Sequence, residues 1–176
     1  LKKMNRVERS LRIVKDQIEA ETGHVWGAVG GGIRLLMFAQ IKIWAEKKFN
    51  INDWYSGSLP SWYDQTDGMK GWNLFKLMHR MTRNENDPAI QLKGGANKCY
   101  GQNLNVNDRF MLCTSYAAQK DFTDFFVKWN PGSQATLVPG ETEPIYIGGI
   151  TEAGKSAVKA LNLPKPDLDP ISIKSP

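Results

Sequence analysis

The sequence predicts a mainly α-helical single domain with about six helices, long structured loops and a minor β element. Three observations predict this fold. Apolar residues recur at helical spacing in several stretches, good strand patterns are nearly absent, and 176 residues suffice for one hydrophobic core but not comfortably for two. Aromatic residues make up 10% of the chain, which excludes wholesale disorder. The mean hydropathy is −0.44 and no apolar run is long enough for a transmembrane segment.

Three helices are expected in the first half of the chain. The stretch Met4–Ile18 has apolar residues three and four positions apart, which predicts an amphipathic first helix. After the glycine-rich stretch 27–32, residues 33–48 are apolar on most sides, so we expect this second helix to be the buried centre of the domain. A third helix is expected over 69–81. Its predicted inward face consists of Trp72, Phe75 and Met78.

Two further helices are expected after residue 100. Asn107 is the expected cap of a fourth helix and Asp121 of a fifth, because a short polar side chain can accept a hydrogen bond from the first helical turn. The fourth should turn inward Phe110, Met111, Thr114 and Ala117 or Ala118. The fifth carries a dense aromatic stripe of Phe122, Phe125, Phe126 and Trp129.

The end of the chain contains the strand candidate, a last helix and a tail. The segment Ile145–Ile147 is the best strand candidate, and Thr151 is expected to open the last helix. Pro164 should stop that helix, so we place the domain at residues 1–163. Residues 164–176 are rich in proline and are expected to form an extended tail.

The net charge of +5 is concentrated in the first helix, which makes a nucleic-acid ligand worth considering. No nucleic-acid-binding motif accompanies this charge, so a solvated helix face is the favoured interpretation and no nucleic-acid partner is expected.

A self-contained metal site is not expected from the residue types present. The two histidines, His24 and His79, do not belong to any His-x-x-x-His pair, and there is no Cys-x-x-Cys. Glu19 and Glu21 lie near His24, but one histidine with two flexible carboxylates is a weak ligand set.

Two stretches could bind a ligand. Gly30, Gly31 and Gly32 precede a helix, where glycine lets a ligand approach backbone amides; a tight turn that allows close helix packing is an equal alternative. The polar loop 53–64 contains two Trp-Tyr pairs, and sugars bind where an aromatic face adjoins polar groups. Burial of these rings over the core is the favoured alternative for that loop.

The two cysteines, Cys99 and Cys113, leave two possibilities open. In a reducing compartment they would be ordinary thiols, whereas in an exported protein they could close a disulfide around a Gly/Asn-rich loop.

Several strings in this order are similar to one known family. They are Lys3–Val7, Arg34–Gln40, Trp44–Glu46, Gly68–Arg80, Met111–Cys113, Phe125–Gly132 and Leu161–Pro166. Together they resemble the C-terminal part of the enhancin-like zinc metallopeptidases, specifically the secreted mucin-degrading lipoproteins of the accessory colonization factor D type. The resemblance covers nearly the whole chain.

The resemblance implies a piece of a longer zinc peptidase that degrades mucin-type glycoproteins during host colonization. The family's His-Glu-x-x-His motif is not in this sequence. We therefore expect no catalytic residue, no metal ligand and no cofactor in this chain, and zinc in the parent enzyme. The chain alone should be inactive, and should support the fold beside an upstream metal-binding lobe, its expected partner.

The resemblance also implies site residues and a location. The family's cleft-facing turn and arginine correspond to Gly30, Gly31, Gly32 and Arg34, preceded by Trp26, and we add Trp62 and Tyr63 as candidate substrate-binding residues. Export of the protein, either secreted or anchored at the outer membrane of a Gram-negative bacterium, would make Cys99–Cys113 a disulfide. The alternative function is an autonomous carbohydrate-binding or adhesin module that uses the aromatic loop.

Overall fold

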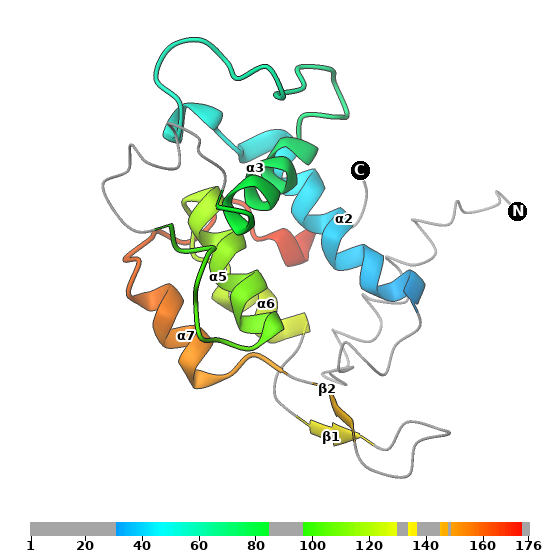
Figure 1. The fold of residues 1–176 in the computed structure, drawn as a ribbon. Helices are drawn as coiled ribbons and strands as arrows, with labels where there is room; N and C mark the ends of the chain where they lie inside the picture. Colours follow the sequence, from blue (N-terminus) through cyan, green and yellow to red (C-terminus); the bar gives the residue numbers. More distant parts are fainter. Residues whose placement is uncertain (1–30, 85–96, 130–133, 137–144, 148, 174–176) are drawn as a thin grey trace, which may run out of the picture.

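The computed structural model describes residues 31–84, 97–129, 134–136, 145–147 and 149–173 (Figure 1). Within these residues it contains five α-helices, a two-stranded antiparallel sheet and two short 3-10 helices, so the predicted mainly α class is confirmed. The predicted first helix, Met4–Ile18, lies outside the described residues. The elements are α2 (Gly31–Lys48), η1 (Ile51–Asp53), α3 (Trp72–Thr82), α5 (Val106–Ala118), α6 (Thr123–Trp129), β1 (Gln134–Thr136), β2 (Ile145–Ile147), α7 (Glu152–Lys159) and η2 (Pro170–Ser172).

Helix α5 occupies the centre of the helical layer, with α3 on one side and α7 on another (Figure 1). All its residues from Met111 to Ala118 are buried. The sequence analysis gave this position to the helix over 33–48. In the structure α2 contributes Met37, Ile41 and Trp44 to the core, but it is buried on one side only, since Phe38 and Lys42 are partly exposed. The small residues of α5 explain the difference, because Ser and Ala side chains let neighbouring helices approach from several sides.

Helix α3 begins three residues later than predicted, and its buried face is rotated from the predicted one. The residues before it form turns, with Met69 donating its N–H to the carbonyl of Thr66. Trp72, predicted to face inward, is 42% exposed, whereas Met78 is buried as predicted. The buried face consists of Asn73, Leu74, Leu77, Met78 and Met81.

The cap of α5 is Asn105, not Asn107. The Asn105 side-chain oxygen accepts the N–H of Asp108 at 2.9 Å, and the Asn105 amide donates to the Asp108 carboxylate at 2.8 Å. This reciprocal pair satisfies a donor of the first helical turn. Asp108 occupies the third helical position that the arrangement requires, whereas Asn107 is already the second residue of the helix.

The predicted aromatic stripe of α6 is confirmed: its four rings are at most 7% exposed. Asp121 accepts the N–H of Thr123 at 2.8 Å, as expected of a residue at the start of this helix.

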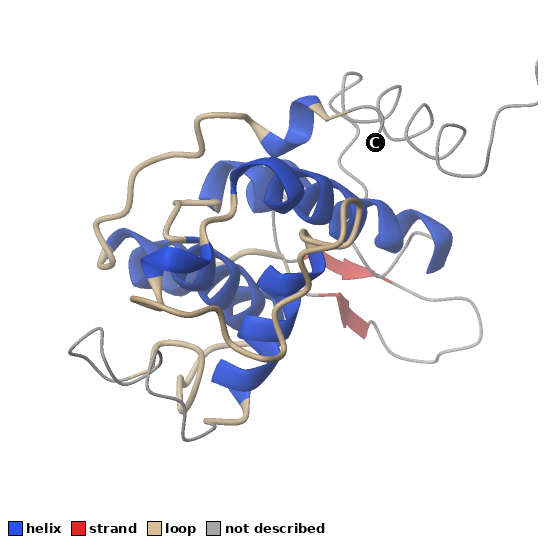
Figure 2. Ribbon diagram, turned by 90° about the horizontal axis from the view of Figure 1, so that it is seen from above, coloured by secondary structure: helices blue, strands red, loops and turns tan. Residues whose placement is uncertain are grey.

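The predicted strand Ile145–Ile147 is confirmed as β2 and pairs antiparallel with β1, with Ala135 opposite Tyr146 (Figure 2). Thr151 caps α7 as predicted, accepting the N–H of Gly154 at 3.4 Å.

Residues 164–173, called the strap below, follow an extended path interrupted by η2 and pack against the helices. The carbonyl of Pro164 accepts the N–H of Asp121 at 2.8 Å. Near the other end of the strap, Pro170 and Ile173 are buried. Four ion pairs join the strap to residues 120–128.

The buried amide of Gln40 joins α2, α6 and the strap. Its nitrogen donates to the carbonyl of Ile173 at 3.0 Å, and its oxygen accepts the indole N–H of Trp129 at 2.9 Å. Gln40 is only 2% exposed, so these bonds compensate for the burial of a polar group. None of the helices among the described residues is long and apolar enough to span a bilayer.

Candidate functional site

The predicted glycine-rich site lies partly outside the described residues. Trp26 and Gly30 belong to that undescribed part, whereas Gly31 and Gly32 form the first two positions of α2. Arg34 lies in the first turn of the same helix, and its side chain is not among those described. A substrate-binding role for this group therefore stays a prediction.

Trp54, from the aromatic loop, is a core residue. It is 3% exposed, and its indole N–H donates to the carbonyl of Ala117 on α5 at 2.8 Å. Its ring meets Tyr116 edge to face, with 4.9 Å between ring centroids. The interpretation favoured from the sequence, that the rings of this loop are buried over the core, is therefore correct for Trp54.

Three other rings of this loop gather at its surface. Tyr55, Trp62 and Tyr63 are half-buried and form the loop aromatic patch, in which the Trp62 centroid lies 5.9 Å from Tyr55 and 6.4 Å from Tyr63. The guanidinium carbon of Arg80 lies 5.6 Å from the Trp62 centroid, close enough for a cation–π interaction. The structure therefore brings Trp62 and Tyr63 together, as proposed from sequence, and adds Arg80 from α3.

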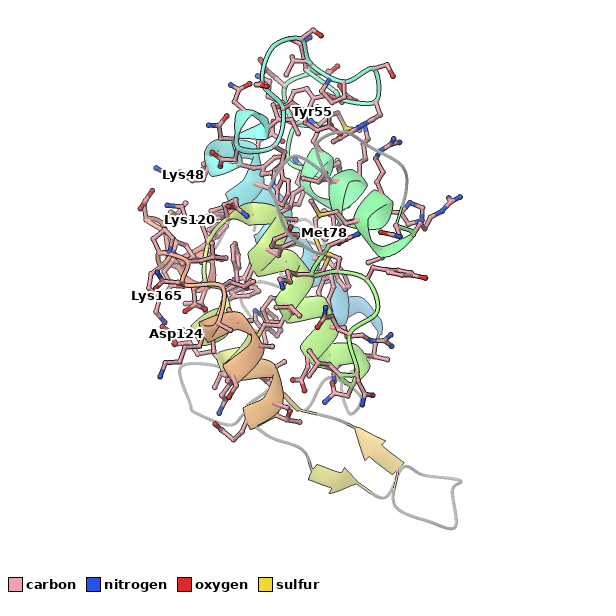
Figure 3. The ribbon with its side chains drawn as sticks, turned by 60° about the vertical axis from the view of Figure 1, so that its left-hand side comes forward. Lys48, Tyr55, Met78, Lys120, Asp124 and Lys165 are labelled. Carbon is pink, nitrogen blue, oxygen red and sulfur yellow. A yellow bond between two sulfur atoms is a disulfide. The ribbon has the colours of Figure 1, made fainter. Side chains whose placement is uncertain are left out.

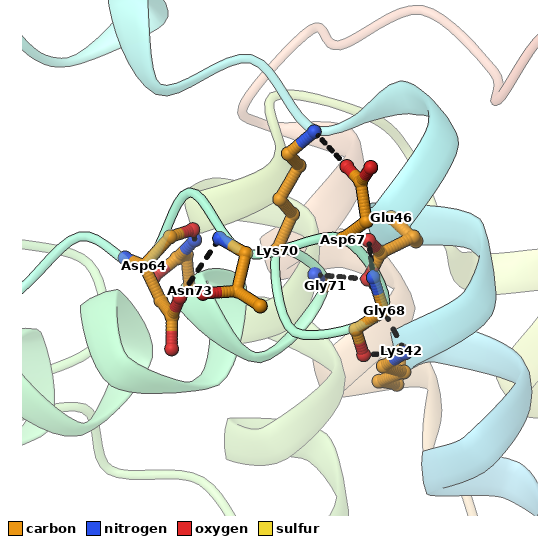
Figure 4. Close-up of polar contacts among 9 residues, drawn as sticks. Lys42, Glu46, Asp64, Asp67, Gly68, Lys70, Gly71 and Asn73 are labelled. Carbon is orange, nitrogen blue, oxygen red and sulfur yellow. Dashed lines mark hydrogen bonds and ion pairs between the residues drawn. The ribbon is translucent and has the colours of Figure 1, made fainter.

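The loop aromatic patch is held by contacts from α3. The carbonyl of Trp62 accepts a hydrogen bond from the Lys76 ammonium at 3.2 Å. The buried amide of Asn73 makes two bonds to the backbone of Asp64, accepting its N–H at 2.8 Å and donating to its carbonyl at 2.7 Å (Figure 4). The indole N–H of Trp62 is buried and has no hydrogen-bond partner.

Glu46 on α2 fixes the turn that follows the patch (Figure 4). Its two carboxylate oxygens accept the N–H groups of Gly68 and Gly71, each at 2.8 Å. Lys42 lies 3.2 Å from the same carboxylate and also donates to the carbonyl of Gly68 at 2.5 Å. Burial opposes ionisation, but the bonds from Gly71 and Gly68 and the charge of Lys42 outweigh it and hold the pKa of Glu46 below its usual value.

A charged groove of about 310 Å³ lies where the strap crosses α6. Lys165 of the strap donates to Asp124 at 2.5 Å and lies 3.7 Å from Asp121; Figure 3 shows Lys165 and Asp124 on the same side of the molecule. The hydrogen bond to Asp124 raises the pKa of Lys165. Sequence reasoning missed this groove because its charges are about 40 residues apart in the chain and no local pattern joins them.

A second groove, of about 370 Å³, lies between α3 and α5. The Cys99–Cys113 disulfide lines it, which agrees with the pairing implied by the family resemblance. The groove is mostly apolar, and two of its lining side chains are well exposed: Tyr100 at 53% and Val106 at 70%. Arg109 is the basic residue among those that line it.

The described residues do not fit a zinc site. They contain no group of three or more His, Cys, Asp or Glu side chains close enough to hold a metal ion. His79 lies exposed on α3, and both cysteines are committed to the disulfide and cannot act as thiolate ligands. We therefore derive no metal-dependent step from these residues.

The comparisons with known proteins connect the chain to much longer ones. Accessory colonization factor AcfD of Vibrio cholerae serotype O1 is 54% identical over 173 residues, which is 98% of this chain and 11% of that protein. Two Escherichia coli proteins named as lipoproteins, YghJ of strain O78:H11 and the AcfD homolog of strain K12, are each 43% identical over 175 residues. The chain is homologous to AcfD-type colonization factors and lipoproteins.

These AcfD relatives match the chain almost from end to end, but the chain spans only 11–12% of their length. No protein-family model matches the sequence. No solved structure matches it significantly either. The family resemblance found in the sequence is thus confirmed at the level of AcfD-type proteins.

Proposed function

We propose that this chain is a supporting helical domain of a longer cell-surface zinc metallopeptidase that degrades mucin-type glycoproteins during host colonization. The observation that carries the proposal is its 54% identity to a colonization factor of which it spans only 11%. The peptidase chemistry comes from the family resemblance of the sequence. In the parent protein, zinc and its general base would belong to another lobe.

The polar contacts of the chain support an architectural role. Gln40, Asn73 and Asp108 are at most 2% exposed, and each bonds to another segment of the chain: Asn73 to the nearby loop, and Gln40 and Asp108 to segments far away in sequence. The Glu46 carboxylate is likewise used to fix a turn. Side chains bonded in this way position elements and are not available to a substrate.

The contribution to a substrate cleft would come from the start of α2 and the loop aromatic patch. Gly31 and Gly32 are the first two residues of α2, where backbone N–H groups have no acceptor within the helix, and Arg34 follows at the start of the same helix. Trp62 and Tyr63 offer ring surface beside the cation of Arg80. Such a combination suits a glycopeptide, which has both apolar ring faces and polar edges.

The disulfide and the names of the relatives favour a location outside the cytoplasm. Disulfides persist in oxidising compartments and are rare in the cytosol. Two of the relatives are named as lipoproteins and one as a colonization factor. We propose that the parent protein is secreted or anchored at the cell surface.

The test compares the longer parent protein with residues 1–176 alone. We expect the parent to cleave mucin and to lose this activity on treatment with a metal chelator, whereas the isolated chain binds no stoichiometric zinc and cleaves nothing. In the parent, Arg34→Ala should raise the KM for glycopeptide more than it lowers thermal stability, with exposed Arg83→Ala as the control. Chelator-sensitive cleavage by the isolated chain would contradict the proposal.

The loop aromatic patch keeps the carbohydrate-binding alternative open. Trp62 and Tyr63 are half-exposed, whereas the buried Trp54 cannot contribute. An autonomous module would bind glycans as residues 1–176 and lose binding in Trp62→Ala. The supporting-domain proposal expects no measurable glycan binding by the isolated chain.

A further inference from the structure

The strap is attached to the helices in two different ways along its length. In its first part, residues 164–169, called here the flap, the carbonyl of Pro164 accepts the N–H of Asp121 at 2.8 Å and charged side chains reach the helices. The rest of the strap, residues 170–173, is instead anchored in the core, because both of its end residues are buried and the Gln40 amide donates to its final carbonyl at 3.0 Å. Polar contacts at the surface therefore hold the flap, whereas burial holds the residues that follow it.

Charged residues occupy every second position of the flap: Lys165, Asp167 and Asp169. Alternate residues of an extended segment lie on the same side, so one side of the flap faces the charges of residues 120–128. Figure 3 shows Lys120, Asp124 and Lys165 on one side of the molecule. The four pairs, given by the distance between the ammonium nitrogen and a carboxylate oxygen, are Lys165–Asp124 at 2.5 Å, Lys165–Asp121 at 3.7 Å, Asp167–Lys120 at 3.5 Å and Asp169–Lys128 at 3.8 Å.

These ion pairs are open to water. The side chains of Lys165, Asp167 and Asp169 are 57%, 71% and 53% exposed, so each pair has one well-solvated partner. An exposed ion pair contributes little to stability, and dissolved salt weakens it further. At 1 M salt the screening length is about 3 Å. Three of the four pairs are separated by 3.5–3.8 Å, which is longer than this, so concentrated salt should weaken them strongly.

The backbone and the packing of the flap add little to these pairs. Pro164 and Pro166 have no N–H to donate, so the flap cannot pair with a neighbour as a regular strand does. Leu168 packs against the core but is only partly buried. The groove of about 310 Å³ lies between the flap and α6, with Phe125 among its lining residues. The flap therefore crosses a space instead of a closely packed surface, and it loses few dispersion contacts if it moves away.

We propose that the flap is a salt-sensitive latch, which lifts away from α6 while the helices and residues 170–173 stay folded. Local opening of this kind needs less free energy than global unfolding, and segments with few buried contacts open most easily. Lifting the flap widens the groove and uncovers the ring of Phe125, which is 2% exposed when the flap is closed. Ionic strength then controls access to the aromatic stripe of α6.

Amide hydrogen exchange of the full chain, followed by NMR at 0.05 M and 1 M NaCl, tests the latch. The N–H of Asp121 reports on the flap, and the N–H of Lys120, bonded to the Ser115 carbonyl at 3.1 Å, is its matched control. The N–H of Ile173, bonded to the Pro170 carbonyl at 3.2 Å, reports on the anchored residues. We expect 1 M salt to accelerate exchange at Asp121 by about fivefold or more relative to Lys120, and to leave Ile173 unchanged relative to Lys120. Equal acceleration at Asp121 and Ile173 would mean that the whole strap opens as one unit, and no acceleration at Asp121 would mean that the flap is not a latch; either result overturns the proposal.

A pair of lysine variants gives an independent readout. Lys165→Ala removes two of the four ion pairs, so it should accelerate exchange at Asp121 by about threefold or more at 0.05 M NaCl and reduce the response to salt. Lys155→Ala is the matched control, since it removes the same charge from a pair with Glu152 on α7, away from the flap, and should leave exchange at Asp121 unchanged. The same exchange rate at Asp121 in both variants would contradict the latch.

Discussion

The carboxylate of Asp108 on α5 accepts two hydrogen bonds from Thr151, the cap of α7. The Thr151 N–H lies 2.9 Å from one oxygen and its hydroxyl 2.6 Å from the other. A third bond comes from the Asn105 amide. One buried carboxylate thus serves the N-termini of two helices, where a negative charge is stabilised by the helix dipoles.

Asp108→Ala should destabilise the protein by about 1–3 kcal/mol, because it leaves the partly buried N–H and hydroxyl of Thr151 without their acceptor. Denaturant unfolding followed by circular dichroism measures the change. Asp167→Ala removes a carboxylate that is 71% exposed and should change stability by less than about 1 kcal/mol. Equal effects of the two substitutions would show that Asp108 does not join the helices.

Gly71→Ala should destabilise the contact between α2 and α3. A Cβ at this position would collide with the backbone carbonyl of Lys42 on α2, and backbone cannot move aside cheaply. The expected loss is about 1–3 kcal/mol, the usual cost of overpacking. Gln65→Ala, at an exposed position of the same loop, is the control. An unchanged midpoint of unfolding for Gly71→Ala would mean that the helices can separate without cost.

Protonation of the Glu46 carboxylate should contribute to a loss of stability at acid pH. Burial opposes ionisation of Glu46, but the hydrogen bonds from Gly71, Lys42 and Gly68 outweigh it and hold the pKa in the folded protein below the value of about 4.3 for an unfolded chain. The contribution is therefore present above pH 4–5 and is lost as the pH falls through the folded pKa. Glu46→Gln should lower stability at pH 7 and reduce the slope of unfolding free energy between pH 5 and pH 3.

The control for this pH experiment is Glu152→Gln, which removes one carboxylate with an 86% exposed side chain and so corrects for the change in net charge. A slope that is the same in Glu46→Gln as in the unsubstituted protein would contradict the assigned role of Glu46.

Removal of the disulfide should destabilise the protein by about 3 kcal/mol, since its cysteines are 14 residues apart and the bond limits the freedom of the unfolded chain. We expect a reducing agent to lower the melting temperature of the protein. It should have no effect on the Cys99→Ser, Cys113→Ser double variant. A melting temperature unaffected by reduction in both proteins would show that the bond adds nothing to stability.

Local patterns predicted much of the fold. The stripe of α6, the strand Ile145–Ile147 and the Thr151 cap each depend on residues within a few positions of one another, and the structure contains all three. The exposure of Trp72 and the identity of the central helix were not predictable in this way. They depend on how α5 packs against α3 and α7, which are far from it in sequence.

In the candidate site, too, only contacts between residues close together in the chain were predictable. The proximity of Trp62 and Tyr63 follows from their adjacency in the chain, whereas Arg80 reaches Trp62 only because α3 returns beside the loop. The bonds of Glu46 to Gly68 and Gly71 likewise cross more than 20 residues. Contacts between residues so far apart in the chain cannot be predicted from the periodicity of the sequence.

The position of Gln40 has a practical consequence for work on the long relatives. Its amide needs the carbonyl of Ile173, and the Trp129 indole needs Gln40 in turn. An expressed piece that stops at Pro164 would lack this acceptor and the buried side chains of Pro170 and Ile173. Pieces intended for crystallisation or binding assays should therefore extend at least through Ile173, although composition alone makes the final residues look dispensable.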